Sequence, residues 1–154
     1  NFRRNQMADA ATVSGTFTVL PDEIAKTISG AMTVTPADST EKWYYKFTSV
    51  SAASTDLIAG SFLDYTAVDD DTAPTAVHTA DTVKFLFIQN THATTSVYIN
   101  IAAGTAAAAA GNIYVGPGES WYARLSLTTV AAVHAITSTG TADCIVAALL
   151  DDVA

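Results

Sequence analysis

The residue types that most often carry out chemistry are few in this sequence and lie far apart along it. The three histidines are His78, His92 and His134, and no two of them form the His-x-His pair of a local metal site. Isolated histidines more often lie at the surface or in turns between strands than around a metal ion. The sequence therefore predicts no histidine-based metal site.

The acidic and thiol groups offer no clearer chemistry. Asp69, Asp70 and Asp71 are consecutive, but the sequence lacks the alternating pattern of an EF-hand calcium loop. Adjacent side chains of an extended chain point apart, so we expect a solvated acidic loop, with a weak divalent-cation site as the alternative. Cys144 is the only cysteine and lies in an apolar segment without a neighbouring His, Lys or Arg. We expect a buried, unreactive thiol and no intrachain disulfide.

The segment GNIYVGPGESWYARL, residues 111–125, holds either a catalytic loop or a turn between two strands. Ser120 lacks the second glycine of a G-x-S-x-G nucleophile elbow, and the segment lacks the lysine of a phosphate-binding loop. Pro117 and Gly118 instead fit the two central positions of a type II turn, because proline presets φ and glycine accepts a positive φ. We predict a structural turn here. Since no constellation supports catalysis, we also predict a non-enzymatic protein without a cofactor or metal.

Aromatic side chains are the remaining candidates for a binding surface. Residues 42–47 (KWYYKF) alternate as a half-buried strand, with Trp43 on one face and Tyr44 on the other. We expect Trp43 and Trp121 to pack in the sheet core. Tyr44 and Tyr122 point the other way, and we predict that they contribute to an interface. A sugar-binding platform and ordinary cross-strand pairs are the alternatives.

Composition and charge describe the surface around these groups. The chain has 154 residues, of which 49% are hydrophobic and only 14% charged, and its net charge is -8. An acidic body repels phosphate backbones, so we expect no nucleic-acid partner. No apolar stretch reaches the roughly 20 residues of a membrane helix, and no apolar segment follows Arg3 and Arg4 as in a signal peptide. We therefore expect no membrane association, and a surface that suits cover by neighbouring proteins.

Alternating apolar and polar residues recur along nearly the whole chain and indicate eight to ten short strands. The length fits one domain, and the pattern predicts an all-β fold, a single-domain β-sandwich or jelly roll. We assign residues 13–154 to this domain and residues 1–12 to an extended N-terminal arm. Within the arm, Phe2, Arg3 and Arg4 are candidates for docking onto a partner, against the alternative of a solvated chain end.

Three segments of the sequence allow more specific predictions. Residues 81–90 and 96–102 are expected to form a hairpin across the polar link THATT. Residues 143–150 are apolar on both faces, which predicts a strand in the centre of a sheet or one covered by a neighbouring subunit. Residues 24–32 (IAKTISGAM) include a strand pattern or, as the alternative, a short helix capped by Asp22.

The C-terminal half resembles small virion proteins of tailed bacteriophages. The resemblance lies in FLFIQNTHATTSVYINIA, NIYVGPGESWYARL and CIVAALLDDV, within residues 83–153. Similar strand and turn patterns occur in phage capsid decoration (cement) proteins. The resemblance implies a jelly-roll or immunoglobulin-like sandwich, often a trimer, that clamps adjacent subunits of the major capsid protein. It implies no catalytic site, and a location on the capsid surface after synthesis in the host cytoplasm.

Other functions remain compatible with the same residues. A tail, fibre or head–tail connector subunit of a virion uses the same β-rich architecture. A carbohydrate-binding module would use the aromatic strands, and a self-assembling filament subunit would use the neutral surface rich in Ala and Thr. A hydrolase would have to assemble its residues from distant segments.

Overall fold

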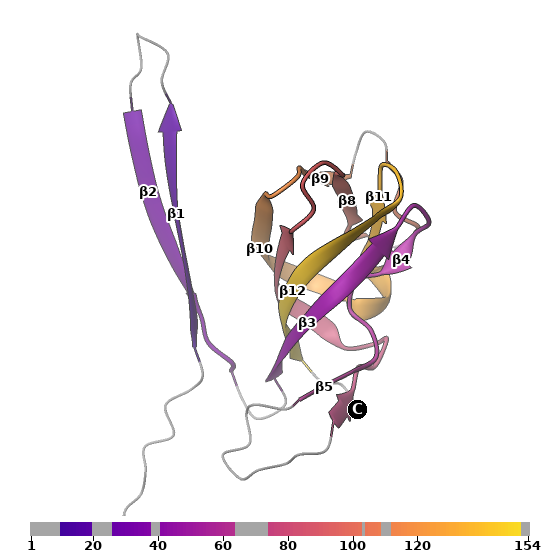
Figure 1. Ribbon diagram of the computed structural model, residues 1–154. Coiled ribbons are helices and arrows are strands. Elements are labelled where there is room, and N and C mark those ends of the chain that lie inside the picture. Colours follow the sequence, from indigo (N-terminus) through magenta and orange to yellow (C-terminus); the bar gives the residue numbers. More distant parts are fainter. Residues whose placement is uncertain are drawn as a thin grey trace, which may run out of the picture. The chain divides into compact units, whose positions relative to one another are not determined.

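The computed structural model describes residues 10–19, 26–37, 41–63, 74–102, 104–108 and 112–151 (Figure 1). In these residues the protein is nearly all β, as the sequence predicts, and has no α-helix. The chain divides into two compact units, residues 1–38 and 39–154. The strands are β1 Ala11–Val19, β2 Lys26–Val34, β3 Glu41–Ser51, β4 Thr55–Asp56, β5 Ser61–Leu63, β6 Pro74–Ala76, β7 Thr82–Asn90, β8 Val97–Asn100, β9 Ile113–Val115, β10 Ser120–Thr129, β11 His134–Thr137 and β12 Thr141–Asp151, with one 3-10 turn, η1 Val130–Ala132.

The first unit contains the antiparallel pair of β1 and β2, each nine residues long. Because residues 26–32 lie in β2, the helix alternative for this segment is wrong there; the β-branched Thr27 and Ile28 favour an extended chain, and Gly30 disfavours a helix. The boundary between the units follows residue 38, so this strand pair is separate from the unit that holds the other strands. Phe2, Arg3 and Arg4 lie outside the described residues.

The second unit contains two four-stranded antiparallel sheets and the short pair of β5 and β6. Sheet I has the strand order β10-β7-β12-β3, and sheet II has the order β4-β11-β8-β9. The pairing is nested along the chain: β3 pairs with β12, β4 with β11, β7 with β10, and β8 with β9. Figure 1 shows β3 and β12 side by side across the front of this unit, with strands of sheet II behind them.

One hydrophobic core draws side chains from both sheets. Sheet I supplies Leu86, Ile88 and Val146, and sheet II supplies Val97 and Ile99, each with 0% exposed surface. The last strand, β12, lies between β7 and β3. This position explains why its residues are apolar on both faces, and it confirms the central-strand prediction.

The expected hairpin between residues 81–90 and 96–102 is wrong. The strand β7 belongs to sheet I and β8 to sheet II, so the polar link crosses from one sheet to the other. Asn90 is buried at this crossing: its Nδ2 donates to the carbonyl oxygens of Thr95 (2.8 Å) and Gly116 (3.1 Å). Its Oδ1 accepts from the amide of His92 (3.0 Å). A buried amide with these partners ties the two sheets together where a hairpin turn was expected.

The two faces of β3 are reversed relative to the sequence prediction. Tyr44 is only 1% exposed and belongs to the core, where its hydroxyl donates to the carbonyl of Ala59 (3.4 Å), so its assignment to an exposed interface is wrong. On the Trp43 face, Tyr45 and Phe47 are 63% and 60% exposed. Both faces carry aromatic residues, so alternation shows that the faces oppose one another but not which of them turns inward.

Candidate interaction surfaces

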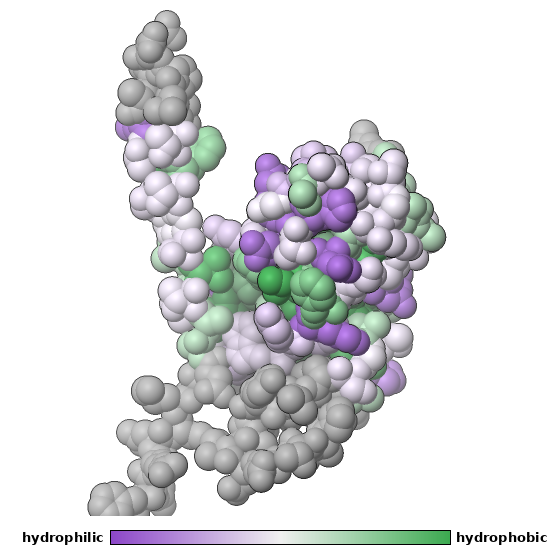
Figure 2. All heavy atoms as spheres, viewed as in Figure 1, coloured by the Kyte–Doolittle hydropathy of each residue, from purple (hydrophilic) through white to green (hydrophobic). Residues whose placement is uncertain are grey.

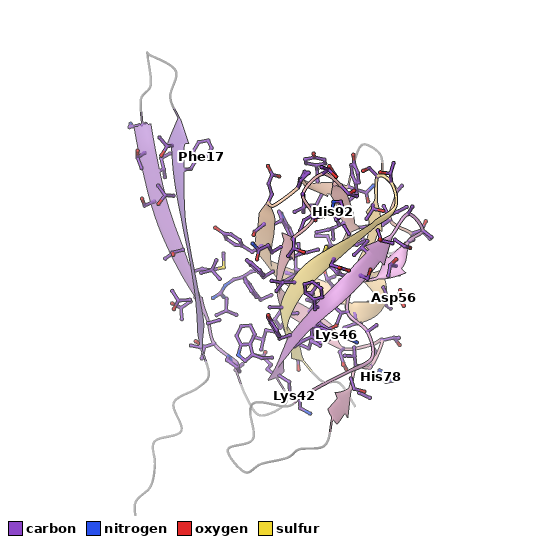
Figure 3. All side chains as sticks on the ribbon, in the orientation of Figure 1. Phe17, Lys42, Lys46, Asp56, His78 and His92 are labelled. Carbon is purple, nitrogen blue, oxygen red and sulfur yellow. The ribbon has the colours of Figure 1, made fainter. Side chains whose placement is uncertain are left out.

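Two of the histidines hold turns of the backbone. The Nδ1 atom of His92 accepts hydrogen bonds from the amides of Thr94 (3.2 Å) and Thr95 (2.9 Å). The Nδ1 atom of His78 accepts one from the amide of Ala80 (3.2 Å). A ring nitrogen that accepts from the backbone directs its lone pair at that donor rather than at a metal ion. Figure 3 shows the two histidines at opposite ends of the second unit.

The third histidine contacts a carboxylate on the neighbouring strand. His134 on β11 is paired with Asp56 on β4, and the Nδ1 and Oδ1 atoms are 3.0 Å apart. The Asp56 side chain is 69% exposed, so water screens this contact and it contributes little to stability. Within the described ranges, no three His, Cys, Asp or Glu side chains gather as a metal site. The acidic run of Asp69, Asp70 and Asp71 lies outside those ranges.

Burial governs the two titratable groups of the core. Cys144 has 0% exposed surface, and burial, followed by the negative charge of Asp143, raises the pKa of its thiol to about 11. Burial also raises the pKa of Tyr44, against the lowering effect of hydrogen bonds with Ala59 and Thr48. Both groups are therefore neutral near pH 7, and Cys144 lacks the thiolate that a nucleophile needs.

The segment around Pro117 is a turn that joins β9 of sheet II to β10 of sheet I. The amide of Glu119 donates to the carbonyl of Gly116 (3.1 Å), which leaves Pro117 and Gly118 at the two central positions. Gly118 has a φ of 73°, a conformation that glycine adopts without strain. The Glu119 carboxylate accepts from the Gly116 amide (2.8 Å) and so braces the turn. These residues have a structural role in this geometry.

The outward face of sheet I is the most extensive candidate surface. Strand register places Tyr122 on it, and the Tyr122 ring stacks on Phe87 with centroids 6.4 Å apart. Trp43 meets Phe85 edge-on at 6.2 Å. The register sets three adjacent rows on this side: Trp43, Leu149, Phe85 and Arg124; Tyr45, Ala147, Phe87 and Tyr122; Phe47, Ile145, Gln89 and Ser120. We call the apolar residues of these rows the aromatic face.

The aromatic face is covered unevenly. Tyr45 and Phe47, on the edge strand β3, are more than half exposed, whereas Phe85 and Leu149 are buried. Figure 2 shows hydrophobic side chains gathered over β3 and β12 among polar ones. A contiguous exposed apolar patch marks a binding site more often than a scattered apolar residue does. The exposed Arg124 lies at the β10 edge of this face, whereas Tyr45 and Phe47 lie at the opposite edge strand, β3.

A bulge on the other edge of sheet I presents a leucine to solvent. Leu127 is 92% exposed and has a φ of 60°. It lies where the register of β10 on β7 shifts between Arg124 and Thr128. A bulge on an edge strand hinders pairing with further strands, and a left-handed conformation costs a leucine about 1 kcal/mol. The bulge thus hinders further strand pairing at this edge and leaves an apolar side chain exposed to solvent.

The β1–β2 hairpin has one apolar and one polar face. Register pairs Val13 with Met32 and Phe17 with Ile28 on the apolar side, which we call the hairpin apolar face. Phe17 and Ile28 are 64% and 59% exposed, and Phe17 projects freely from β1 in Figure 3. The opposite face consists of small, mostly hydroxyl-bearing residues: Thr12, Ser14, Thr16, Thr18, Thr27, Ser29, Ala31 and Thr33.

Sequence reasoning did not single out the exposed apolar residues of these surfaces. Tyr45 and Phe47 lie on the face opposite the predicted interface, Ile28 lies in the segment for which a short helix is the alternative, and Phe17 is not among the predicted interface residues. The alternation of hydroxyl and apolar residues in β1 and β2 was the available signal. It predicts a hairpin with two unlike faces, but it does not say that the apolar face is left without cover. Nothing in the sequence marks Leu127, because a bulge depends on the partner strand.

Comparison with known proteins adds no family to these observations. No family model, curated protein or solved structure matches the chain. Among the described residues, no helix is long and apolar enough to cross a membrane. The strand order and the surfaces are therefore the observations from which a function can be inferred.

Proposed function

We propose that this chain is a non-enzymatic structural protein of a virion, a capsid decoration protein with a jelly-roll body. The observation that carries the proposal is the nested pairing of β3 with β12, β4 with β11, β7 with β10, and β8 with β9. Nested pairing over two four-stranded sheets is the strand order of a jelly roll, which is common in viral capsid and lectin domains. Because one fold hosts many functions, the surfaces have to decide between these classes.

The chemistry of the described residues supports assembly rather than catalysis. His78 and His92 hold turns, Glu119 braces a turn, and Cys144 is buried. Exposed apolar side chains occur in pairs on two surfaces, Tyr45 and Phe47 on the aromatic face and Phe17 and Ile28 on the hairpin apolar face. Surfaces of this kind act by burying area against other proteins.

The proposed mechanism is the repetition of modest interfaces. Each copy binds the major capsid protein across the boundary between two adjacent subunits, on the outer surface of the shell. A specific interface buries about 1,600 Å² in total. The chain associates into a homo-oligomer, which is a trimer in the form that the resemblance implies, so each oligomer makes several such interfaces. Symmetry repeats the contact over the shell, so the assembled layer binds with avidity. Phe2, Arg3 and Arg4 remain candidates for an additional contact with a capsid subunit.

The test is whether the protein binds virus particles and stabilises them. Particles are prepared from a phage in which the gene for this chain is deleted, and the purified chain is added back. We expect hundreds of copies per particle and a higher temperature of shell opening. Binding in only about a dozen copies, as for a head–tail connector, or no binding to particles would contradict the proposal.

A carbohydrate-binding module is the second candidate function, and the exposure of Tyr45 and Phe47 on one sheet face favours it. Aromatic rings on such a face can stack on sugar rings. This candidate predicts binding to an oligosaccharide array that Tyr45→Ala removes and that Tyr44→Phe, a change in the core, preserves. Sugar binding together with a failure to bind particles would replace the capsid proposal.

A further inference from the structure

The hairpin apolar face contains a gap at its centre. Gly15 and Gly30 are paired directly, and they lie on the same side as Phe17 and Ile28 because alternate residues of a strand share a face. A Cβ atom added to Gly30 would meet nothing within 4 Å. An aromatic ring packed over paired glycines restores contacts that the missing side chains leave open.

Two rings of the aromatic face are spaced along their strand as Gly15 and Phe17 are spaced along β1. Tyr45 and Phe47 are two residues apart on β3 and point the same way, at a separation of about 7 Å. Gly15 and Phe17 are separated in the same manner on β1. One ring of the aromatic face can therefore fill the gap while the neighbouring ring packs beside Phe17.

We propose that the hairpin apolar face of one copy packs on the aromatic face of a second copy of this chain. Nine-residue strands extend about 30 Å and a strand pair is about 10 Å wide, so each docked hairpin buries about 600 Å² counted over both surfaces. A reciprocal pair of copies buries about 1,200 Å², which reaches the lower limit for a specific, stable interface. A two-stranded ribbon is marginally stable alone, so the same contact stabilises the hairpin.

The described residues that leave β2 favour a second copy over the hairpin's own sheet. After Val34, the residues Thr35, Pro36 and Ala37 form no turn. Proline fixes its own φ and holds the preceding residue extended. A stiff, extended segment next to the hairpin favours exchange between copies.

The experiment compares the molar masses of full-length variants by size-exclusion chromatography with light scattering. The hairpin variant is Phe17→Asp with Ile28→Asp, and the sheet variant is Tyr45→Asp with Phe47→Asp. The control, Thr16→Asp with Ser29→Asp, places the same pair of charges on the polar face of the same strands. We expect the unaltered chain and the control to elute at a multiple of 16.0 kDa and both face variants to elute at 16.0 kDa. Near-ultraviolet circular dichroism, which reports on Trp43 and Trp121 in the second unit, checks that this unit stays folded in each variant.

Mixing the two face variants tests exchange directly. The hairpin variant keeps an intact aromatic face, and the sheet variant keeps an intact hairpin. The mixture keeps only one of the two reciprocal contacts, about 600 Å² over both surfaces, so we expect it to dissociate at concentrations where the unaltered chain is still an oligomer. A monomeric unaltered chain, an oligomer that neither face variant dissociates, or a mixture as stable as the unaltered oligomer would overturn the proposal. These masses do not depend on the proposed function, so a failure to bind particles leaves them unchanged.

Discussion

The two faces of sheet I both carry apolar side chains, but they differ in chemistry and in cover. The inner face packs aliphatic side chains such as Leu86, Ile88 and Val146 into the core without exposed surface. The outer face presents rings, and Tyr45 and Phe47 are more than half exposed. Branched aliphatic side chains interdigitate with a facing sheet, whereas stiff rings with a polar edge tolerate water and lose little entropy on binding. Hydrophobicity alone therefore does not identify a core.

Removing a side chain from the inner face gives the largest expected effect. Leu86→Ala leaves a cavity between the sheets and lowers the free energy of unfolding by about 3–4 kcal/mol. Urea denaturation followed by circular dichroism measures this loss. A loss below about 1 kcal/mol would show that the core around Leu86 is loosely packed, which contradicts its 0% exposure.

The crossing between the sheets gives the next largest effect. Asn90→Ala removes the amide that joins Thr95 and Gly116, leaves buried carbonyl groups without donors, and lowers the free energy of unfolding by about 2–3 kcal/mol. Asn100→Ala is the matched control, because that amide bonds an exposed carbonyl. Equal losses in the two variants would mean that Asn90 does not tie the sheets together.

The stability of the protein at high pH tests the inner face of sheet I, because Cys144 and Tyr44 are buried there. Because the folded state raises the pKa of Cys144 from an ordinary 9.0 to about 11, its contribution to stability is complete below pH 9 and is lost as the pH rises through 11. The raised pKa of Tyr44 acts in the same direction. We expect the free energy of unfolding to fall by about 2 kcal/mol over this interval and the fall to be smaller in Cys144→Ala. An equal fall in both proteins would show that Cys144 does not contribute to the loss of stability at high pH.

The bulge on β10 predicts a gain in stability rather than a loss. Leu127→Gly relieves the left-handed conformation and loses little packing, so we expect the free energy of unfolding to rise by about 1 kcal/mol. Thermal unfolding measures the change, with Leu125→Gly, which removes packing against the core, as a destabilising comparison. A destabilised Leu127→Gly variant would show that this side chain is packed in solution.

The smallest effect on stability is expected on the outer face. Phe47→Ser removes an exposed ring, so the free energy of unfolding of the separated chain changes by less than about 0.5 kcal/mol. Urea denaturation at a concentration where the chains are dissociated measures this quantity. A loss comparable to that of Leu86→Ala would mean that Phe47 belongs to a core, and it would remove the distinction between the two faces.

The sequence predicted the class of fold and most of the strands, because alternation and turn residues are local signals. The segment from Gly116 to Glu119 is an example, since proline and glycine carry their backbone preferences into any fold. The central place of β12 was predictable for a similar reason, because apolar residues on both of its faces require cover on both sides.

The surfaces were harder to predict because they depend on partners distant in the chain. Tyr44 and Tyr45 are adjacent aromatic residues, and only the packing of sheet I on sheet II decides which one is enclosed. The link after Asn90 has the composition of a hairpin turn, but it connects strands of different sheets. The nested pairing joins strands from opposite ends of the second unit's sequence, such as β3 and β12, and no local sequence pattern encodes such a pairing.

The central claim is that the exposed apolar faces of this chain are made to be covered by other copies of it. The most direct test is the molar mass of the unaltered, full-length chain by light scattering over a range of concentrations. The account predicts an oligomer, a multiple of 16.0 kDa, that dissociates on dilution. A mass of 16.0 kDa at every concentration would contradict it.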